Sequence, residues 1–191
     1  MYSRKIDPKF NNNENPRIGL IALATDYMIE KDFIHVIKDK KIDFFVNRIE
    51  CFNPLTSENL IKMSEKVTEV TKDILPGEKI DCVVYGCTSG TIAAGYESIK
   101  DKIKKAKPEA EVTTPSTASI KALKKLNLNK IAIFTPYPKK LNDQVIDFFN
   151  KENFIITANS YFDISSDIDI GKVDPNYLYD VLSKMDLKGA D

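Results

Sequence analysis

The segment YGCTSGT, residues 85–91, places Cys87 between two glycines directly after an apolar run. Glycines at these positions allow a tight turn and a close approach of the backbone to a ligand. The free N–H groups of Thr88, Ser89 and Gly90 would then point into a site suited to a small anion. The free N–H groups of a helix N-terminus carry a partial positive charge. That charge would also favour the thiolate of Cys87, by about 0.3 to 1 kcal/mol. The segment predicts either a reactive cysteine beside an anion-binding turn or a small, buried structural cysteine.

Several familiar cysteine and glycine motifs do not fit this segment. A P-loop would need a lysine directly after Gly90, and a cysteine phosphatase would need an arginine where Ala93 stands. A Cys-His hydrolase would need His35, the single histidine, to reach Cys87 from a distant helix. That arrangement stays open from the sequence, although we expect His35 at the surface. With one histidine far from every cysteine, no metal site is predicted.

Composition limits the compartment and the partners. Cys51, Cys82 and Cys87 form an odd set of cysteines in a chain without a signal segment, which indicates reduced thiols and a cytoplasmic protein. Lysine plus arginine equals aspartate plus glutamate at 28 each, so no net field attracts nucleic acid. No apolar run of about 18 residues is present. We therefore expect neither a nucleic-acid nor a membrane partner.

The elements that must position Cys87 follow an alternating pattern. Residues 1–15 are polar and aperiodic, and we expect a loose N-terminal arm. From Pro16 onward, apolar runs alternate with amphipathic runs of about 10 to 20 residues, which is typical of an α/β protein with parallel, doubly wound sheets. Helix starts are expected near Thr56, Pro115 and Asp174. Strand alternation places Cys82 on the face opposite Cys87.

A weak internal repeat suggests two lobes. The segments beginning at Arg17 and at Lys130 share a strand, a polar turn and an amphipathic helix, and Asp81 and Asp191 occupy equivalent places after them. The sequence predicts a first α/β lobe over residues 16–114 and a second over 115–191. The second lobe is expected to lack its last strand or strands and helix, because the chain stops where the repeat would begin a further strand.

The quoted motifs resemble a known superfamily. The segments RIGLIALATDYMIEKDF, NRIECFNPLTSENL, VVYGCTSGTIAAG, TPSTASIKALKKL and IAIFTPY are similar to the aspartate/glutamate racemase superfamily. They are closest to its branch of maleate isomerase, arylmalonate decarboxylase and ectoine-utilization proteins. The resemblance implies two pseudo-symmetric lobes around a cleft, no cofactor or metal, and a small carboxylate or amino-acid-like substrate. A homo-oligomer is compatible with it.

The resemblance also assigns roles to residues. Cys87 matches the first-lobe cysteine that acts at the substrate carbon, Thr88 and Ser89 match the neighbouring carboxylate donors, and Tyr137 matches a second-lobe donor. Such donors would stabilise an enediolate, an effect of roughly 3 to 4 kcal/mol per donor. Tyr137 could instead belong to the core.

Two departures from the pattern leave the activity open. Asp26 replaces an asparagine, which disfavours a dicarboxylate and favours a substrate with an ammonium, amidine or amide nitrogen, unless Asp26 is only a helix cap. The second-lobe cysteine has no counterpart, and neither Cys51 nor Cys82 is expected to replace it. The sequence thus predicts a racemase- or isomerase-like protein acting next to a carboxylate, with a possible role in ectoine degradation. The alternative is a non-catalytic carboxylate-binding protein or a degenerate fragment.

Overall fold

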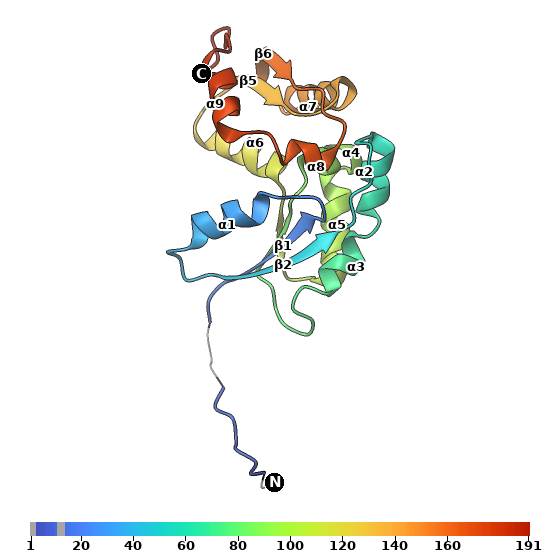
Figure 1. The fold of residues 1–191 in the computed structure, drawn as a ribbon, viewed down its shortest axis with the longest axis vertical. Coiled ribbons are helices and arrows are strands. Elements are labelled where there is room, and N and C mark those ends of the chain that lie inside the picture. Colours follow the sequence, from blue (N-terminus) through green and yellow to red (C-terminus); the bar gives the residue numbers. More distant parts are fainter. Residues whose placement is uncertain (1–2, 11–13) are drawn as a thin grey trace.

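The computed structural model describes residues 3–10 and 14–191. Residues 3–10 form no helix or strand, are exposed, and extend away from the folded part of the chain (Figure 1). The other residues of the expected arm, 1–2 and 11–13, lie outside the described residues. At the end of that segment, Asn15 donates a hydrogen bond to Asp43 at 3.1 Å. The regular structure begins immediately afterwards, at Arg17.

The larger of two sheets contains four parallel strands in the order β2-β1-β3-β4. Their bounds are Arg17–Leu23 for β1, Asp43–Ile49 for β2, Cys82–Tyr85 for β3 and Glu111–Thr113 for β4. The five residues from Gly19 to Leu23 in the central strand β1 are all buried. This agrees with the prediction from the apolar runs, because a parallel strand covered on both faces needs apolar side chains on both.

Helices cover both faces of the larger sheet. Helix α1 (Ile29–Ile37) packs on one face, where its Ile29 and Phe33 contact a cluster built on Leu20 and Val84. The other face carries four helices, namely α2 (Ser57–Ser64), α3 (Val67–Lys72), α4 (Thr88–Ala94) and α5 (Tyr96–Ala106). Cys82 packs with the α1 face and Cys87 with the opposite one, so the predicted alternation is confirmed.

Some helices are shorter than the amphipathic runs suggested. The run from Thr56 to Leu75 is divided into α2 and α3, and the run after Cys87 is divided into α4 and α5. Gly95 separates the latter pair with φ +83°, a backbone conformation that favours glycine. The division turns α5 away from α4, so that α4 is a short helix whose first turn carries Cys87 and its neighbours.

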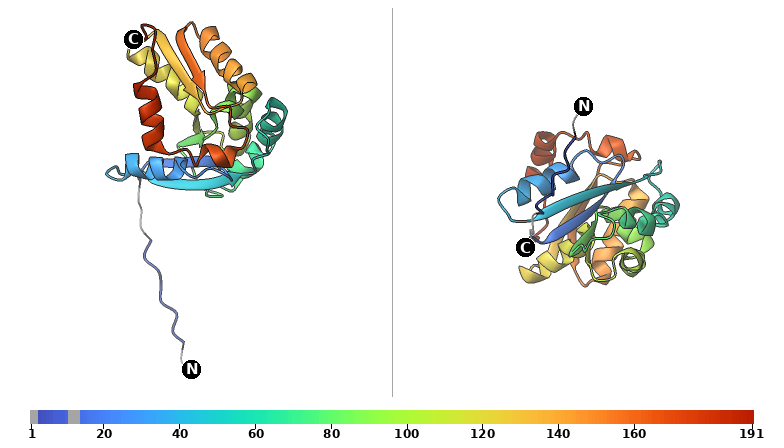
Figure 2. Two further views of the ribbon diagram at one scale, coloured as in Figure 1. Left: turned by 45° about the horizontal axis from the view of Figure 1, so that its top comes forward. Right: turned by 90° about the horizontal axis from the view of Figure 1, so that it is seen from below.

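The smaller sheet contains the parallel strands β5 (Lys130–Thr135) and β6 (Ile155–Tyr161). Its surroundings are the helices α6 (Pro115–Lys125), α7 (Lys139–Lys151), α8 (Asp167–Ile170) and α9 (Pro175–Ser183). The three expected helix starts are confirmed: Thr56 and Asp174 accept capping hydrogen bonds, and Pro115 is the first residue of α6. The two sheets lie apart, with the N-terminal arm running out from the larger one (Figure 2).

The internal repeat is visible in the hydrogen bonds. The Asp81 backbone N–H donates to Arg17 O at 2.9 Å, and the Asp81 side chain accepts from Arg17 N at 2.8 Å. At the start of β5, Asp191 makes the same pair of bonds with Lys130, each at 2.8 Å. The predicted equivalence of Asp81 and Asp191 is therefore confirmed, because β1 in the larger sheet and β5 in the smaller one are each held at their first residue by an aspartate.

Candidate active site

Cys87 lies at the carboxyl end of β3 and is the N-cap residue of α4. Its sulfur accepts the Gly90 N–H at 3.2 Å and lies 3.8 Å from the Ser89 hydroxyl. The side chain of Thr91 donates to the Cys87 carbonyl at 2.7 Å and so fixes the turn. A cysteine at this position of a helix directs its sulfur at the unpaired N–H groups of the first turn. The predicted turn is present and its Gly90 N–H is taken by the sulfur itself, while binding of an anion there stays a prediction.

Close packing surrounds the sulfur. A Cβ added to Gly90 would lie 2.8 Å from Cys87 Sγ, 2.7 Å from Tyr85 Oη and 3.1 Å from Met63 Cε, so only glycine fits there. Tyr85 is fully buried, and its hydroxyl has no hydrogen-bond partner among the described residues. The hydroxyl nonetheless lies near the Cys87 sulfur, since both are within 2.8 Å of the position that a Cβ on Gly90 would take, and Cys87 is one of the groups that raise the pKa of Tyr85.

Burial decides the charge state of Cys87. Cys87 is 4% exposed, and burial raises the pKa of its thiol to about 12. The Gly90 N–H and the Ser89 hydroxyl act in the opposite direction and lower the pKa, as the helix position predicts. The predicted direction of the helix N-terminus is therefore confirmed, but desolvation outweighs a contribution of about 0.3 to 1 kcal/mol, so the thiol needs further neighbours or a substrate-assisted step to ionise.

The structure brings Tyr137 to the same place from the other half of the chain. Tyr137 packs against both major apolar clusters, and its pKa is raised mainly by burial and next by Cys87. Side-chain hydrogen bonding by Ser89 and Thr88 lowers that pKa. Cys87, Thr88, Ser89 and Tyr137, four residues singled out in the sequence, thus form one cluster.

Asp26 caps the turn that leads into α1, whose N-cap residue is Met28. Its carboxylate accepts the N–H groups of Met28 at 2.7 Å and Ile29 at 2.9 Å, just before and at the start of α1. The carboxylate is also close enough to Asp167 to raise the pKa of that residue. Of the two interpretations left open by the sequence, the cap is what the hydrogen bonds describe, and contact with a substrate stays a prediction.

Asp167 and Cys51 complete the cluster and were not predicted. Thr25 Oγ1 donates a hydrogen bond to Asp167 Oδ2, and the Asp167 N–H donates to Asn53 Oδ1 at 3.0 Å. The charge of Asp167 raises the pKa values of Cys51, Cys87 and Tyr137. Asp167 begins the short helix α8, which lies between the smaller sheet and the strands β1 and β2 (Figure 1). No sequence motif marks this acidic segment. Its position near Cys87 depends on the chain returning to the first sheet, which only the tertiary structure shows.

His35 and Arg48 do not belong to the cluster. His35 is exposed on α1, as expected. The Arg48 guanidinium pairs with Glu30 at 2.9 Å and donates to the carbonyls of Leu23 and Asp26 at 3.0 and 3.1 Å. Arg48 therefore holds the loop that carries Thr25 and Asp26 and does not point a free cation at Cys87.

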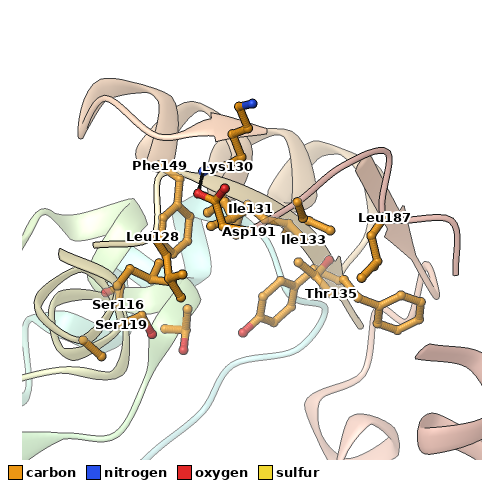
Figure 3. Close-up of a pocket in the computed structure, with 18 of the residues that line it drawn as sticks. Ser116, Ser119, Leu128, Lys130, Ile131, Ile133, Thr135, Phe149, Leu187 and Asp191 are labelled. Atoms are coloured by element: carbon orange, nitrogen blue, oxygen red, sulfur yellow. Dashed lines mark hydrogen bonds between the residues drawn. The ribbon is translucent and has the colours of Figure 1, made fainter. Parts of the chain in front are cut away.

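A cavity of about 720 Å³ opens beside Thr88 and Tyr137. It runs along β5, and the apolar side chains of Leu128, Ile131 and Phe149 gather at it (Figure 3). Asp191 lies at its edge next to Lys130. The cluster therefore has an opening beside Thr88 and Tyr137, although Cys87 and Ser89 do not line it.

Within residues 3–10 and 14–191, no group of three or more histidine, cysteine, aspartate or glutamate side chains could hold a metal ion. No helix in the same part of the chain is long and apolar enough to cross a membrane.

Known proteins resemble this chain in sequence and in fold. It is 23% identical to the maleate isomerases of Geobacillus stearothermophilus and Pseudomonas putida KT2440, with 92% of this chain and 74% of each relative covered. The fold matches the crystal structure of maleate isomerase Iso from Pseudomonas putida S16 with a TM-score of 0.83 at 20% identity, covering 93% of this chain and 76% of that one.

Two further matches concern cysteine chemistry and the family. A Nocardia farcinica maleate cis-trans isomerase variant, solved with a covalently bound succinylcysteine intermediate, has a TM-score of 0.82 at 17% identity, over 92% of this chain and 75% of that one. The arylmalonate decarboxylase family profile matches residues 93–189. Since that match spans more than half of the chain, the protein belongs to the arylmalonate decarboxylase family.

Proposed function

We propose that this protein catalyses a cofactor-independent, racemase- or isomerase-type reaction at the carbon next to a carboxylate, with Cys87 as acid/base or nucleophile. The observation that carries the proposal is the placement of Cys87 at the N-terminus of α4, with the Ser89 hydroxyl 3.8 Å from its sulfur and Tyr137 reaching it from the second half of the chain. Family membership supports the same class of chemistry. The motif resemblance is the only support for a role in ectoine degradation.

The proposed chemistry assigns separate tasks to the clustered residues. The hydroxyls of Thr88, Ser89 and Tyr137 hold the substrate carboxylate and donate to its oxygens as charge develops on them. The Cys87 thiolate removes the proton from the adjacent carbon, the electron pair moves into an enediolate, and the resulting thiol returns a proton to that carbon. As a nucleophile, the same thiolate would add to a double bond, allow rotation and leave again.

Ionisation of Cys87 is the demanding step. With a pKa of about 12 the thiol is protonated at neutral pH in the free protein, so the reaction requires a route for its proton. This observation favours a second candidate function, in which the cluster binds a small carboxylate without turning it over. Both candidates use Thr88, Ser89 and Tyr137 in the same way and differ only at the sulfur.

Exchange of a substrate hydrogen with solvent separates the two candidates. We expect the wild-type protein in deuterium oxide to exchange the α-hydrogen of one enantiomer of 2-aminobutyrate, detected by proton NMR. Cys87→Ser should lower that rate by about a hundredfold or more and retain binding. Cys82→Ser is the matched control, because Cys82 packs on the opposite face of the sheet.

Each result decides between the candidates. Exchange that persists in Cys87→Ser would remove Cys87 from the reaction. Binding without exchange in the wild-type protein would establish the carboxylate-binding function instead. Loss of exchange in Cys82→Ser as well would point to a general loss of structure, which circular dichroism of the two variants would reveal.

A further inference from the structure

The Tyr85 hydroxyl is a buried polar group that the proposed reaction does not use. Tyr85 is fully buried, and its Oη atom has no hydrogen-bond partner among the described residues. A hydroxyl in this state has lost its hydrogen bonds to water and gained none within the protein, which costs folding free energy. Buried polar groups in folded proteins are nearly always paired, so the position of this hydroxyl needs a physical reason.

The hydroxyl lies beside the sulfur of Cys87. Tyr85 ends β3 and Cys87 stands two positions later in an extended conformation, so the backbone turns both side chains to the same face of the sheet. A Cβ on Gly90 would lie 2.7 Å from Tyr85 Oη and 2.8 Å from Cys87 Sγ. The next atom, Met63 Cε at 3.1 Å, belongs to a methyl group and cannot accept a hydrogen bond. The sulfur can accept one, so it is the candidate acceptor for the hydroxyl at this point of the core.

Backbone hydrogen bonds hold the two side chains in this arrangement. The Gly86 N–H donates to Ile21 O at 2.9 Å, which ties the end of β3 to β1. The Cys87 N–H donates to the Tyr85 carbonyl, also at 2.9 Å, and Thr91 fixes the Cys87 carbonyl at the start of α4. The strand end and the first turn of the helix therefore keep the hydroxyl and the sulfur close together, whether or not a hydrogen bond joins them.

The charge state of the sulfur decides whether the hydroxyl gains a partner. A thiol is a weak acceptor, whereas hydrogen bonds to an ionised group are roughly twice as strong as neutral ones. The sulfur already accepts the Gly90 N–H at 3.2 Å, and the Ser89 hydroxyl lies 3.8 Å away. Burial raises the pKa values of Cys87 and Tyr85 and leaves the tyrosine the weaker acid of the two. The tyrosine hydroxyl therefore keeps its proton when the thiol ionises.

We propose that Tyr85 is a positioning residue for Cys87: the tyrosine hydroxyl donates a hydrogen bond to the sulfur when the thiol ionises. This inference rests on the proposed function, in which the thiolate is the reacting group. The ionised sulfur then has three donors, namely the hydroxyls of Tyr85 and Ser89 and the Gly90 N–H. The thiol proton passes to water or to the incoming substrate carboxylate, and Tyr85 keeps its own proton. Tyr85 therefore acts through the cysteine and does not touch the substrate.

A carboxyl at position 87 tests the donor without any substrate. Aspartate is a favourable residue at the N-cap position that Cys87 holds, and its charge develops at a pH where folded proteins can be studied. Urea unfolding of Cys87→Asp from about pH 4 to 8, referenced to the uncharged Cys87→Asn, gives the pKa of the introduced carboxyl. Adding Tyr85→Phe should raise that pKa by about one pH unit, which is a tenfold loss of acidity. Adding Tyr96→Phe should leave it unchanged, because Tyr96 donates to Val112 O at 3.0 Å. An unchanged pKa in the Tyr85→Phe background would overturn the inference.

The hydrogen-exchange reaction supplies a second test that does not depend on the folding of Cys87→Asp. With 2-aminobutyrate as the probe, Tyr85→Phe should lower the maximal exchange rate about tenfold and keep the KM within about twofold of wild type, because the hydroxyl stabilises the thiolate and does not bind the substrate. Tyr96→Phe should exchange as wild type. A Tyr85→Phe variant with the wild-type maximal rate, or with a raised KM alone, would contradict the positioning role.

Failure of the proposed function and failure of this inference can be told apart. If the wild-type protein exchanges no hydrogen, the proposed function fails, but the pKa of the introduced carboxyl still decides whether Tyr85 donates to an anion at position 87. If exchange occurs and depends on Cys87, while Tyr85→Phe changes neither the rate nor that pKa, the proposed function stands and Tyr85 belongs only to the core.

Discussion

The Tyr85 hydroxyl and the Cys87 sulfur flank one point in the core: a Cβ built on Gly90 would lie 2.7 Å from the first and 2.8 Å from the second. The hydroxyl is buried and unpartnered among the described residues, while the sulfur carries a thiol whose pKa is raised by burial. An O–H group beside a thiol gains a strong acceptor only when the thiol ionises. This relationship leads to the first prediction.

Replacing Tyr85 with phenylalanine should separate stability from reactivity. The free energy of unfolding should stay constant or rise by up to about 1 kcal/mol, because a buried hydroxyl without a partner is removed. Alkylation of Cys87 by iodoacetamide should slow roughly tenfold, since its thiolate loses a potential donor. Tyr96→Phe is the control: Tyr96 donates to Val112 O at 3.0 Å, so its loss should cost about 1 kcal/mol and leave Cys87 unchanged. Faster alkylation in Tyr85→Phe would refute this role.

Gly90→Ala should destabilise the protein although it lies in a helix. Alanine normally stabilises a helix interior over glycine by about 0.5 to 1 kcal/mol. Here the added Cβ would press on Cys87 Sγ and Tyr85 Oη, so we expect a net loss of about 1 to 3 kcal/mol and altered Cys87 alkylation. In Gly95→Ala the Cβ would meet nothing within 4 Å, and only the backbone strain of φ +83° remains. Urea unfolding of both variants distinguishes the two causes, and a more stable Gly90→Ala would contradict the packing described.

Alkaline pH should destabilise the folded chain through its buried thiols. The pKa of Cys87 is raised from its ordinary value of 9.0 to about 12, and that of Cys51 to about 11. Between pH 9 and these values the unfolded chain has released thiol protons that the folded chain keeps, so the free energy of unfolding falls as pH rises. Below pH 9 the contribution is fully present. Urea unfolding from pH 8 to 11 should show a shallower fall in Cys87→Ser than in wild type; parallel curves would mean that the thiol ionises freely in the fold.

Tyr137→Phe should weaken ligand binding more than folding. The hydroxyl lies with those of Thr88 and Ser89, where the proposed function places the substrate carboxylate. Loss of one donor to a charged group corresponds to roughly tenfold or more in affinity for 2-aminobutyrate. Tyr177→Phe, an exposed tyrosine on α9, should bind as wild type. Calorimetric affinities that are equal in Tyr137→Phe and wild type would remove Tyr137 from the site.

Much of the fold follows from local pattern. Continuous apolar runs predict buried parallel strands, and the capping residues at Thr56 and Asp174 mark helix starts, because both signals depend on neighbours in the chain. The glycines on either side of Cys87 mark a closely packed segment, because a Cβ added at either position would lie less than 3 Å from a neighbouring side chain. The division of two amphipathic runs at Gly95 and before Val67 was not predicted, since periodicity continues across a break in the helix.

The sequence by itself determined that Cys87 would stand at the carboxyl end of a strand, at the start of a helix, with Thr88 and Ser89 beside it. Only the tertiary structure decided that Asp167 lies near that cysteine and that burial outweighs the helix end in setting its pKa. The reason is physical: turns and caps depend on adjacent residues, whereas charge state and proximity depend on segments that are 80 positions apart and meet only when the chain has folded.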